Sequence, residues 1–198
     1  MALKLKIILG STRPGRVGPT IGRWLADAAS AHGLFEVELV DLAELGLPLL
    51  DEPAHPRLQQ YQHEHTKRWS RIVGSADAFL FVTPEYDYFP PAALINAVQV
   101  LSREWAQKPA GVLSYGGVSG GLRAAQVLRT LLSNVNVHAL PNVVPVPMFA
   151  QAIRDGAFHP AEPTAAGATT LLDDLHRWAA ALKGLRDEQA RTAREKAA

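Results

Sequence analysis

Residues 4–18 read KLKIILGSTRPGRVG, an apolar run that ends in a turn rich in glycine, hydroxyl and arginine side chains. A helical pattern with one apolar face follows from Thr20 to His32. A strand that leads through such a turn into a helix forms an anion site, because free backbone N–H groups and the positive end of the helix dipole attract phosphate. Arginine adds forked hydrogen bonds to phosphate oxygens. This stretch therefore predicts a phosphate-binding turn between a strand and a helix.

Short apolar runs alternate with longer helical patterns along the rest of the chain. This alternation predicts an α/β fold in which a parallel sheet has helices on both faces. The expected strands are Lys4–Leu9, Phe35–Asp41, Ala78–Thr83, Ala110–Tyr115 and Asn136–Val146. The expected helices are Thr20–His32, Arg57–Val73, Pro91–Leu101, Gly120–Ser133 and a last one from about Thr164. Ligands of such sheets bind beyond the carboxyl ends of the strands, so the loops after the first, third and fourth strands are the ones to examine.

The length and composition suit one domain. A chain of 198 residues, 47% of them hydrophobic, is long enough for one well-buried domain and short for two. We expect this domain to span residues 1–185. Residues 186–198 are charged and rich in alanine, so we expect a frayed helix or a disordered tail there.

Charge and cysteine content exclude several classes of function. Lys+Arg 20 against Asp+Glu 19 leaves a formal charge of +1, which gives no argument for nucleic-acid binding. The absence of cysteine excludes disulfides, thiolate metal sites and a cysteine nucleophile, so redox chemistry would need a bound cofactor. No stretch of about 18 apolar residues and no cleavage-site pattern occurs. We therefore expect a cytoplasmic protein with neither a nucleic-acid nor a membrane partner.

The first loop resembles two known phosphate loops and matches neither. Gly10 and Gly15 have the spacing of a nucleoside-triphosphate loop, but Arg16 and Val17 stand where lysine and the magnesium-binding hydroxyl are needed. The glycine spacing of a dinucleotide-binding turn is also missing. A monophosphate held by hydroxyls and arginine fits best, and an ordinary glycine-bearing turn is the alternative.

The second loop, residues 83–91, reads TPEYDYFPP and follows the third expected strand. Its aromatic and proline residues predict a stiff apolar ledge suited to a planar ring. Glu85 and Asp87 leave open an acid–base pair or a metal site.

The third loop, residues 114–121, reads SYGGVSGG. Small residues there let the backbone approach a flat ligand closely. The alternative is a serine hydrolase, because GVSGG matches G-x-S-x-G with Ser119 as the nucleophile. That enzyme would need an Asp and a His, and the available pairs are Asp155 with His159 and Asp173 with His176.

Two histidines on one expected helix raise the question of a metal site. His63 and His65 are two apart, so on a helix their side chains point about 200° away from each other and cannot share one ion. No metal site is predicted.

Taken in order, the three loops resemble the NADPH-dependent FMN reductase family of flavodoxin-like proteins, over roughly Lys4 to Val146. The resemblance rests on residues 10–13 (GSTR), on residues 83–86 (TPEY) followed by Pro91, Leu94, Asn96 and Ala97, and on residues 114–117 (SYGG) leading into residues 121–124 (GLRA). It implies a flavodoxin-like three-layer sandwich with a five-stranded parallel sheet in the order 2-1-3-4-5.

The resemblance also implies FMN bound across the strand ends. The phosphate would lie on Ser11, Arg13, Arg16, Val17 and Gly18. The isoalloxazine ring would lie on Pro84, Glu85, Tyr86 and the adjacent Asp87, with its pyrimidine edge on Ser114, Tyr115, Gly116 and Gly117. Three departures from the family concern Asp87 in place of Asn, Ile95 in place of Lys, and Arg16 and Gly18 in place of Ser and Asn.

The implied activity is an NAD(P)H oxidoreductase. Hydride would pass from NADPH or NADH to FMN and then, in a ping-pong sequence, to a quinone, azo, nitro, metal-oxyanion or flavin acceptor. No side chain is assigned as catalytic, because the cofactor carries the chemistry. The resemblance implies a homodimer or a dimer of dimers, with Pro91–Arg103 as an interface helix. A flavodoxin-type electron carrier or a flavin-regulated binding protein is the alternative.

Overall fold

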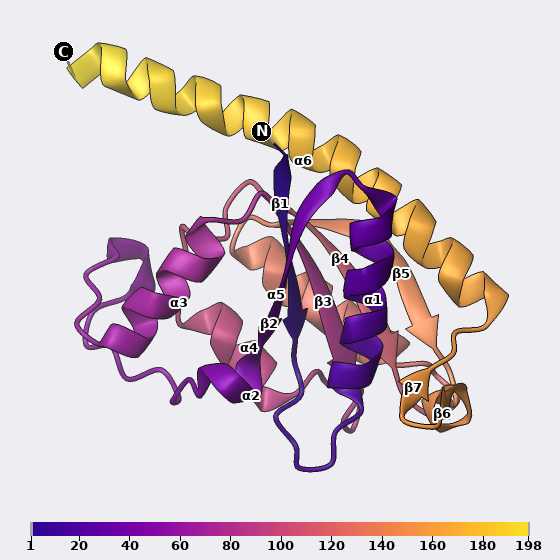
Figure 1. Ribbon diagram of the computed structural model, residues 1–198. Helices are drawn as coiled ribbons and strands as arrows, with labels where there is room; N and C mark the ends of the chain where they lie inside the picture. Colours follow the sequence, from indigo (N-terminus) through magenta and orange to yellow (C-terminus); the bar gives the residue numbers. More distant parts are fainter. Residues whose placement is uncertain (1, 198) are drawn as a thin grey trace.

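The computed structural model describes residues 2–197, and a five-stranded parallel sheet lies at its centre (Figure 1). The strands run in the order β2-β1-β3-β4-β5, which confirms the predicted topology. Their bounds are β1 (Leu3–Leu9), β2 (Phe35–Asp41), β3 (Ala78–Pro84), β4 (Pro109–Tyr115) and β5 (His138–Val146). Every residue of β3 and β4 is buried, because these central strands are covered on both faces.

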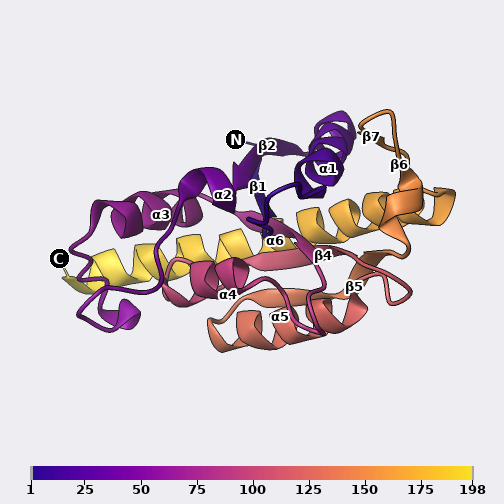
Figure 2. The same ribbon diagram turned by 90° about the horizontal axis from the view of Figure 1, so that it is seen from below.

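Helices cover both faces of the sheet. They are α1 (Gly18–His32), α2 (Leu42–Leu45), α3 (Glu64–Gly74), α4 (Ala92–Gln99), α5 (Leu122–Asn134) and α6 (Glu162–Ala197). Seen from below in Figure 2, α3 and α4 lie on one side of the sheet and α1 lies on the other. Two apolar clusters fill the layers, one where α1 and α6 pack on the sheet and one beneath α3, α4 and α5. The predicted three-layer arrangement is therefore confirmed.

One predicted helix is shorter than expected. The pattern from Arg57 to Val73 contains a short 3₁₀ turn, η1 (Pro56–Leu58), and α3 begins only at Glu64. Gln59 has a left-handed backbone with φ 54°, which ends the 3₁₀ turn. The Glu52 carboxylate then accepts hydrogen bonds from the backbone N–H groups of residues 62 and 63, just before α3.

Further small elements lie in two connections, the one between β2 and α3 and the one between β5 and α6. Asp41 caps α2 by accepting a hydrogen bond from the N–H of Ala43 at 2.9 Å. A 3₁₀ turn, η2 (Phe149–Ala152), and an antiparallel hairpin of β6 (Ile153–Arg154) and β7 (Ala157–Phe158) join β5 to α6. None of these short elements has a periodicity long enough to be read from the sequence.

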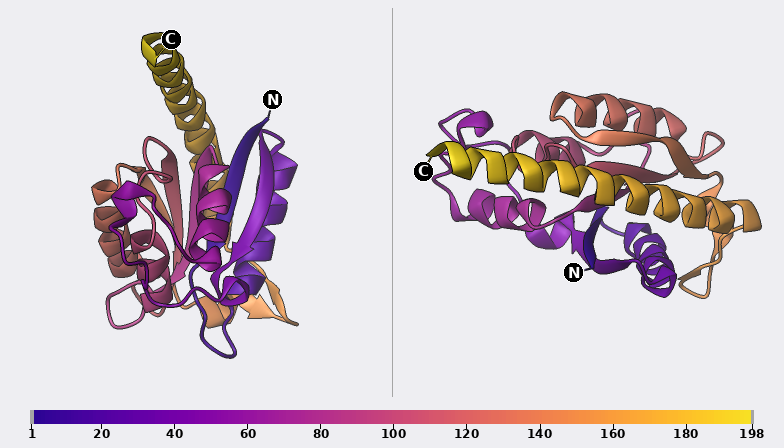
Figure 3. Two further views of the ribbon diagram at one scale, coloured as in Figure 1. Left: turned by 90° about the vertical axis from the view of Figure 1, so that its left-hand side faces the viewer. Right: turned by 90° about the horizontal axis from the view of Figure 1, so that it is seen from above.

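The last helix, α6, has 36 residues and begins two residues before the expected start at Thr164. It continues through residues 186–197, where we expected a frayed helix or a disordered tail. Figure 3 shows its C-terminal end projecting past the rest of the molecule. Arg186 is half-buried, and residues 187–196 are exposed. The division into residues 1–185 and a separate tail stays a prediction. Within residues 2–197, no helix has both the length and the apolar character needed to cross a membrane.

Backbone hydrogen bonds hold the three predicted loops at the carboxyl edge of the sheet. The N–H of Gly10 donates to the carbonyl of Val82 at 2.9 Å, which joins the loop after β1 to β3. The N–H of Glu85 donates to the carbonyl of Tyr115 at 3.1 Å, which joins the loops after β3 and β4. The fold therefore brings segments more than 70 residues apart in sequence to one place.

Candidate functional site

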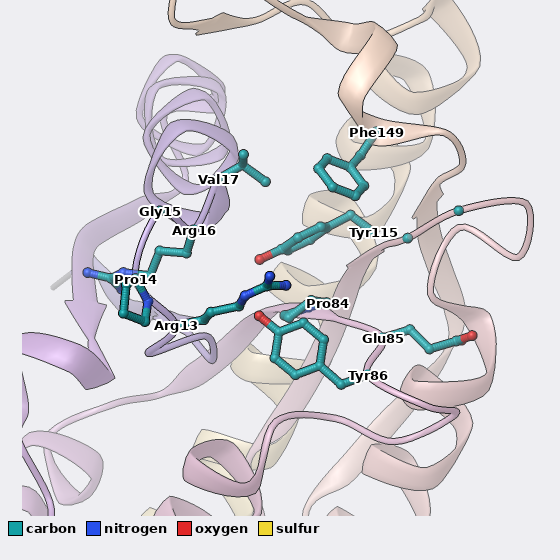
Figure 4. Close-up of a pocket in the computed structure, with 12 residues that line it drawn as sticks. Arg13, Pro14, Gly15, Arg16, Val17, Pro84, Glu85, Tyr86, Tyr115 and Phe149 are labelled. Carbon is teal, nitrogen blue, oxygen red and sulfur yellow. The ribbon is translucent and has the colours of Figure 1, made fainter.

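A cavity of about 340 Å³ opens where the loops after β1, β3 and β4 meet (Figure 4). Its size lies within the range of about 300–1,000 Å³ that is typical of ligand pockets. The lining residues are Arg13, Pro14, Gly15, Arg16, Val17, Pro84, Glu85, Tyr86, Tyr115, Gly116, Gly117 and Phe149. All three predicted loops contribute to this wall. The predicted residues that do not line it are Ser11, Gly18, Asp87 and Ser114.

One end of the cavity suits an anion. The Arg13 side chain points into the cavity in Figure 4, and within residues 2–197 it forms no ion pair. Val17 stands at the N-cap of α1 without a side-chain cap, and the first turn contains no acidic residue. The first N–H groups of a helix have no intrahelical acceptor and carry the positive end of its dipole. A guanidinium and free N–H groups are therefore available to a phosphate.

Arg16 differs from Arg13 although both lie in the same loop. Its Nη1 donates to Asp41 Oδ1 at 2.5 Å and to the carbonyl of Ser11 at 2.8 Å. The hydrogen bond with Asp41 raises the pKa of the Arg16 guanidinium above its ordinary value, although burial opposes the rise. Arg16 therefore braces the first loop against the end of β2 and also lines the cavity, and its contact with phosphate stays a prediction.

Ser11 lies behind the wall of the cavity and is 1% exposed. Its hydroxyl shares a hydrogen bond of 2.8 Å with the Tyr86 hydroxyl, so it is already paired. Tyr115 is also buried here, and burial, reinforced by the nearby Tyr86, raises its pKa well above the ordinary tyrosine value. A Cβ at Gly18 would lie 3.1 Å from the Tyr115 hydroxyl. Gly18 therefore permits the close approach of α1 to Tyr115.

Glu85 borders the cavity, but its carboxylate is bonded to the start of α5. Oε2 accepts from the backbone N–H groups of Arg123 at 3.0 Å and Ala124 at 3.3 Å. Oε1 accepts from Ser119 Oγ at 3.0 Å and lies 3.1 Å from Arg123 Nε. A carboxylate with these partners acts as a helix cap rather than as the acid–base or metal group that the sequence left open.

Asp87 lies in a tight hairpin turn rather than on the wall. Asp87 and Tyr88 have φ 48° and 75°, and the backbone N–H groups of Tyr86 and Phe89 each donate to the other residue's carbonyl, at 2.9 and 3.0 Å. Two central residues with positive φ are the mark of a type I′ turn. Asp tolerates this conformation because its short side chain can bond to nearby backbone.

The third loop is a tight glycine turn. Ser114 is fully buried and donates through Oγ to the carbonyl of Gly120 at 2.9 Å, so its hydroxyl already has a protein partner. Gly121 has φ 82°, and a Cβ there would lie 2.8 Å from the backbone nitrogen of Tyr115. The N–H of Gly116 donates to Val146 at 3.2 Å. Across residues 2–197, the N–H of Gly117 donates to no protein acceptor, which leaves it for a ligand.

The serine hydrolase alternative is contradicted by the surroundings of Ser119. Its hydroxyl donates to Glu85, and no imidazole bonds to it among the described residues. Asp173 of the proposed pair bonds instead to His32 at 3.0 Å, while His176 packs against Phe35. A serine nucleophile of this kind needs an imidazole base within hydrogen-bond reach, and within residues 2–197 the Ser119 hydroxyl has instead the Glu85 carboxylate, which caps α5.

The two histidines behave differently from the helical pair that we expected. His63 lies before α3 with an extended backbone, and its ring stacks on that of His65 at 5.2 Å. Within residues 2–197, no group of three or more His, Cys, Asp or Glu side chains is placed to hold a metal ion.

Phe149 is the wall residue that the sequence analysis missed outside the quoted loops. Its ring meets Tyr115 edge to face, with centroids 5.4 Å apart. The signal that could have found it is its position directly after the fifth strand, because all strand ends of a parallel sheet lie at one edge.

Sequence comparisons identify relatives that match most of the chain. The model of the family described as NADPH-dependent FMN reductase matches residues 3–151. An NAD(P)H-dependent FMN reductase of Schizosaccharomyces pombe is 36% identical over 160 residues, which cover 80% of each chain. An NADPH azoreductase of a Bacillus species is 32% identical over 144 residues, covering 72% of this chain and 75% of the relative.

Solved structures share the fold at lower identity. The flavoenzyme NAD(P)H:(acceptor) oxidoreductase of Paracoccus denitrificans superposes with a TM-score of 0.69 at 23% identity, covering 90% of this chain and 97% of that one. The apo form of an NADH:FMN oxidoreductase gives a TM-score of 0.66 at 18% identity, covering 88% and 89%.

Proposed function

The chain belongs to the NADPH-dependent FMN reductase family of oxidoreductases, and from this premise we propose that it passes electrons from NADPH or NADH, through FMN held in the cavity, to a small-molecule acceptor such as a quinone. The observation that carries the proposal is the pairing of an anion site with a ring site in one cavity. Arg13 and the uncapped start of α1 form the first, and the loops after β3 and β4 form the second.

The residues present fit FMN. Its phosphate would be held by the Arg13 guanidinium and the backbone N–H groups of Val17 and Gly18, which donate to no protein acceptor within residues 2–197. Its ring system would lie between the Pro84–Tyr86 segment and the Gly116–Gly117 segment, with the N–H of Gly117 free to donate to the ring's polar edge. Ser11 and Ser114 support these segments from behind the wall, and Arg16 holds the first loop against Asp41.

FMN held there would supply the redox chemistry, namely hydride acceptance from NAD(P)H and electron transfer to the acceptor in two alternating half-reactions. The protein's own part is to bind and orient. Glu85 is engaged with three hydrogen-bond donors and the Arg123 guanidinium, and Tyr115 is buried, so neither supplies a proton in this proposal. Asp87 lies on the hairpin turn and stays outside the wall.

A spectrum of the purified protein tests the proposal. After incubation with FMN and removal of free flavin, we expect flavin absorbance in the protein fraction and its bleaching on anaerobic titration with NADPH. We also expect steady NADPH oxidation with a benzoquinone and no partner protein. A protein that binds flavin but needs an added reductase would be an electron carrier instead. A protein that neither binds FMN nor oxidises NADPH would refute the proposal.

The proposal includes the homodimer or dimer of dimers that the family resemblance implies. Light scattering of the flavin-loaded protein at several concentrations tests it. A mass of one 21.4 kDa chain at all concentrations would contradict it.

A further inference from the structure

Two adjacent residues of the loop after β3 extend to opposite sides. Figure 4 shows the Tyr86 ring and the Glu85 carboxylate pointing away from each other. Successive side chains of an extended segment alternate in direction. Because β3 lies between β1 and β4 in the sheet, its loop has a neighbouring loop on each side. Glu85 and Tyr86 can therefore reach both neighbours at once.

The Tyr86 side chain fastens the first loop. Its hydroxyl shares the 2.8 Å hydrogen bond with Ser11, which is 1% exposed and immediately follows Gly10 at the end of β1. Arg13, the cation that points into the cavity, lies two residues further along. A fixed Ser11 limits where the Arg13 backbone can lie. The Tyr86 hydroxyl thus acts on the phosphate end of the cavity through Ser11, which lies behind the wall.

The Glu85 side chain fastens the third loop. Its side chain is 10% exposed, and it accepts from Ser119 Oγ and from two backbone N–H groups at the start of α5, while Arg123 Nε forms an ion pair with it at 3.1 Å. Ser119 is the serine of the G-x-S-x-G match, and its hydroxyl also accepts from the N–H of Gly121 at 3.3 Å. The segment between β4 and α5, which contains Gly117, is therefore held by hydrogen bonds to the loop after β3.

We propose that Glu85 and Tyr86 are positioning residues that preform the flavin cavity from its two ends. Tyr86 holds the phosphate loop through Ser11, and Glu85 holds the glycine turn through Ser119 and the start of α5. The inference rests on the proposed function, since it assigns the two ends to the phosphate and the ring of FMN. It gives each side chain a separate effect, because the two act on different loops.

Affinities for FMN and riboflavin separate the two effects, because riboflavin lacks the phosphate. We expect Tyr86→Phe to weaken FMN binding about fivefold, the effect of one lost hydrogen bond, with riboflavin binding almost unchanged. We expect Glu85→Gln to weaken FMN binding and riboflavin binding equally. The reason is that the amide nitrogen of Gln cannot accept from the N–H groups that the carboxylate binds. The ratio of the FMN affinity to the riboflavin affinity therefore falls in Tyr86→Phe and keeps its wild-type value in Glu85→Gln.

Hydrogen exchange of the flavin-free protein gives a second readout. Glu85→Gln should speed amide exchange in residues 117–124 and leave the first loop unchanged, whereas Tyr86→Phe should speed exchange around Ser11 and Arg13. Tyr61→Phe and Glu104→Gln are matched controls, because their side chains are hydrogen-bonded to each other at 3.2 Å and line no part of the cavity. Both controls should keep the wild-type affinities for both flavins.

The outcomes are distinguishable. An unchanged FMN-to-riboflavin ratio in Tyr86→Phe, or a Glu85→Gln effect confined to FMN, would overturn the inference while leaving the function intact. Wild-type protein that binds neither flavin would overturn the proposed function itself.

Discussion

At the scale of single residues, the first loop separates two arginines that look equivalent in the sequence. Arg13 points into the cavity, whereas Arg16 is paired with Asp41 and with the carbonyl of Ser11. The sequence could predict that this loop binds an anion, because glycine, hydroxyl and arginine side chains follow a strand. It could not predict the partner of Arg16, because Asp41 lies 25 residues away at the end of another strand.

This difference makes a prediction for the two arginines. Arg13→Ala should weaken FMN binding by about 1.5–3 kcal/mol, the usual contribution of a charged hydrogen bond, and leave riboflavin binding unchanged. Arg16→Ala should act mainly on stability, because it leaves the largely buried Asp41 carboxylate without its cation. Fluorescence titration and urea denaturation measure the two effects, with the exposed Arg23→Ala as a control. Equal losses of FMN affinity in the two variants would contradict this assignment.

Lys108 is a buried cation outside the cavity. It is 5% exposed and donates through Nζ to the carbonyls of Val73 at 2.8 Å and Gly74 at 3.1 Å, at the end of α3. Burial lowers its pKa from the ordinary 10.5 to about 8, with the nearby Arg186 acting in the same direction. Below pH 8 the lysine is charged in both the folded and the unfolded chain. The cost of burying this charge therefore lowers the free energy of unfolding in full at these pH values.

The resulting pH dependence has a definite sign. Between about pH 8 and 10.5 the unfolded chain holds the Lys108 proton and the folded chain releases it, so stability rises with pH. The free energy of unfolding of the wild type should gain up to about 3 kcal/mol relative to Lys108→Met across this interval. Urea denaturation at several pH values measures the difference. A difference that stays flat or falls between these pH values would show that Lys108 is not the titrating group.

At the scale of elements, the sequence could predict all five strands and the long amphipathic helices, because each has enough residues to show a period. The short pieces between β2 and α3 could not be predicted, because their form depends on distant partners. Asn96 of α4, for example, donates to the carbonyl of Pro48 at 2.7 Å and accepts from the N–H of Leu50 at 3.0 Å. Such contacts exist only after the sheet has placed α4 beside this segment.

The end of α6 carries the next prediction. Arg186 pairs with Asp77 at 2.9 Å and donates to the carbonyl of Gln107 at 2.7 Å, whereas residues 187–196 are exposed. Removal of residues 188–198 should therefore change the free energy of unfolding little. Arg186→Ala should cost about 1–3 kcal/mol, because both partners lose a charged hydrogen bond.

Urea denaturation of both variants, with the exposed Arg191→Ala as the control, measures these effects. A truncation that costs more than Arg186→Ala would mean that the projecting part of α6 packs against something in solution.

At the scale of the whole molecule, three loops far apart in sequence form one wall because every strand of a parallel sheet ends at the same edge. That rule is enough to predict the place of the site from the sequence. The roles of Glu85 and Tyr86 could not be predicted, because the Glu85 carboxylate was equally consistent with an acid, a metal ligand or a cap until its three hydrogen-bond donors and its ion pair with Arg123 were known. The G-x-S-x-G match shows the same limit. Ser119 hydrogen-bonds to Glu85 and to the N–H of Gly121, so it stabilises the turn between β4 and α5 and is not placed for hydrolysis.

A ligand that binds only the folded molecule raises its stability as a whole. At a concentration of 100 times its dissociation constant, FMN should add about 2.7 kcal/mol to the free energy of unfolding. For a chain of this length, that corresponds to a rise in Tm of about 5–10 °C. Riboflavin at the same concentration should give a smaller rise, because it leaves Arg13 and the start of α1 without an anion. In Arg13→Ala the difference between the Tm rises caused by FMN and by riboflavin should shrink. Differential scanning calorimetry measures these Tm values. Equal shifts with both flavins in the wild type would mean that the phosphate lies outside the cradle formed by Arg13 and α1.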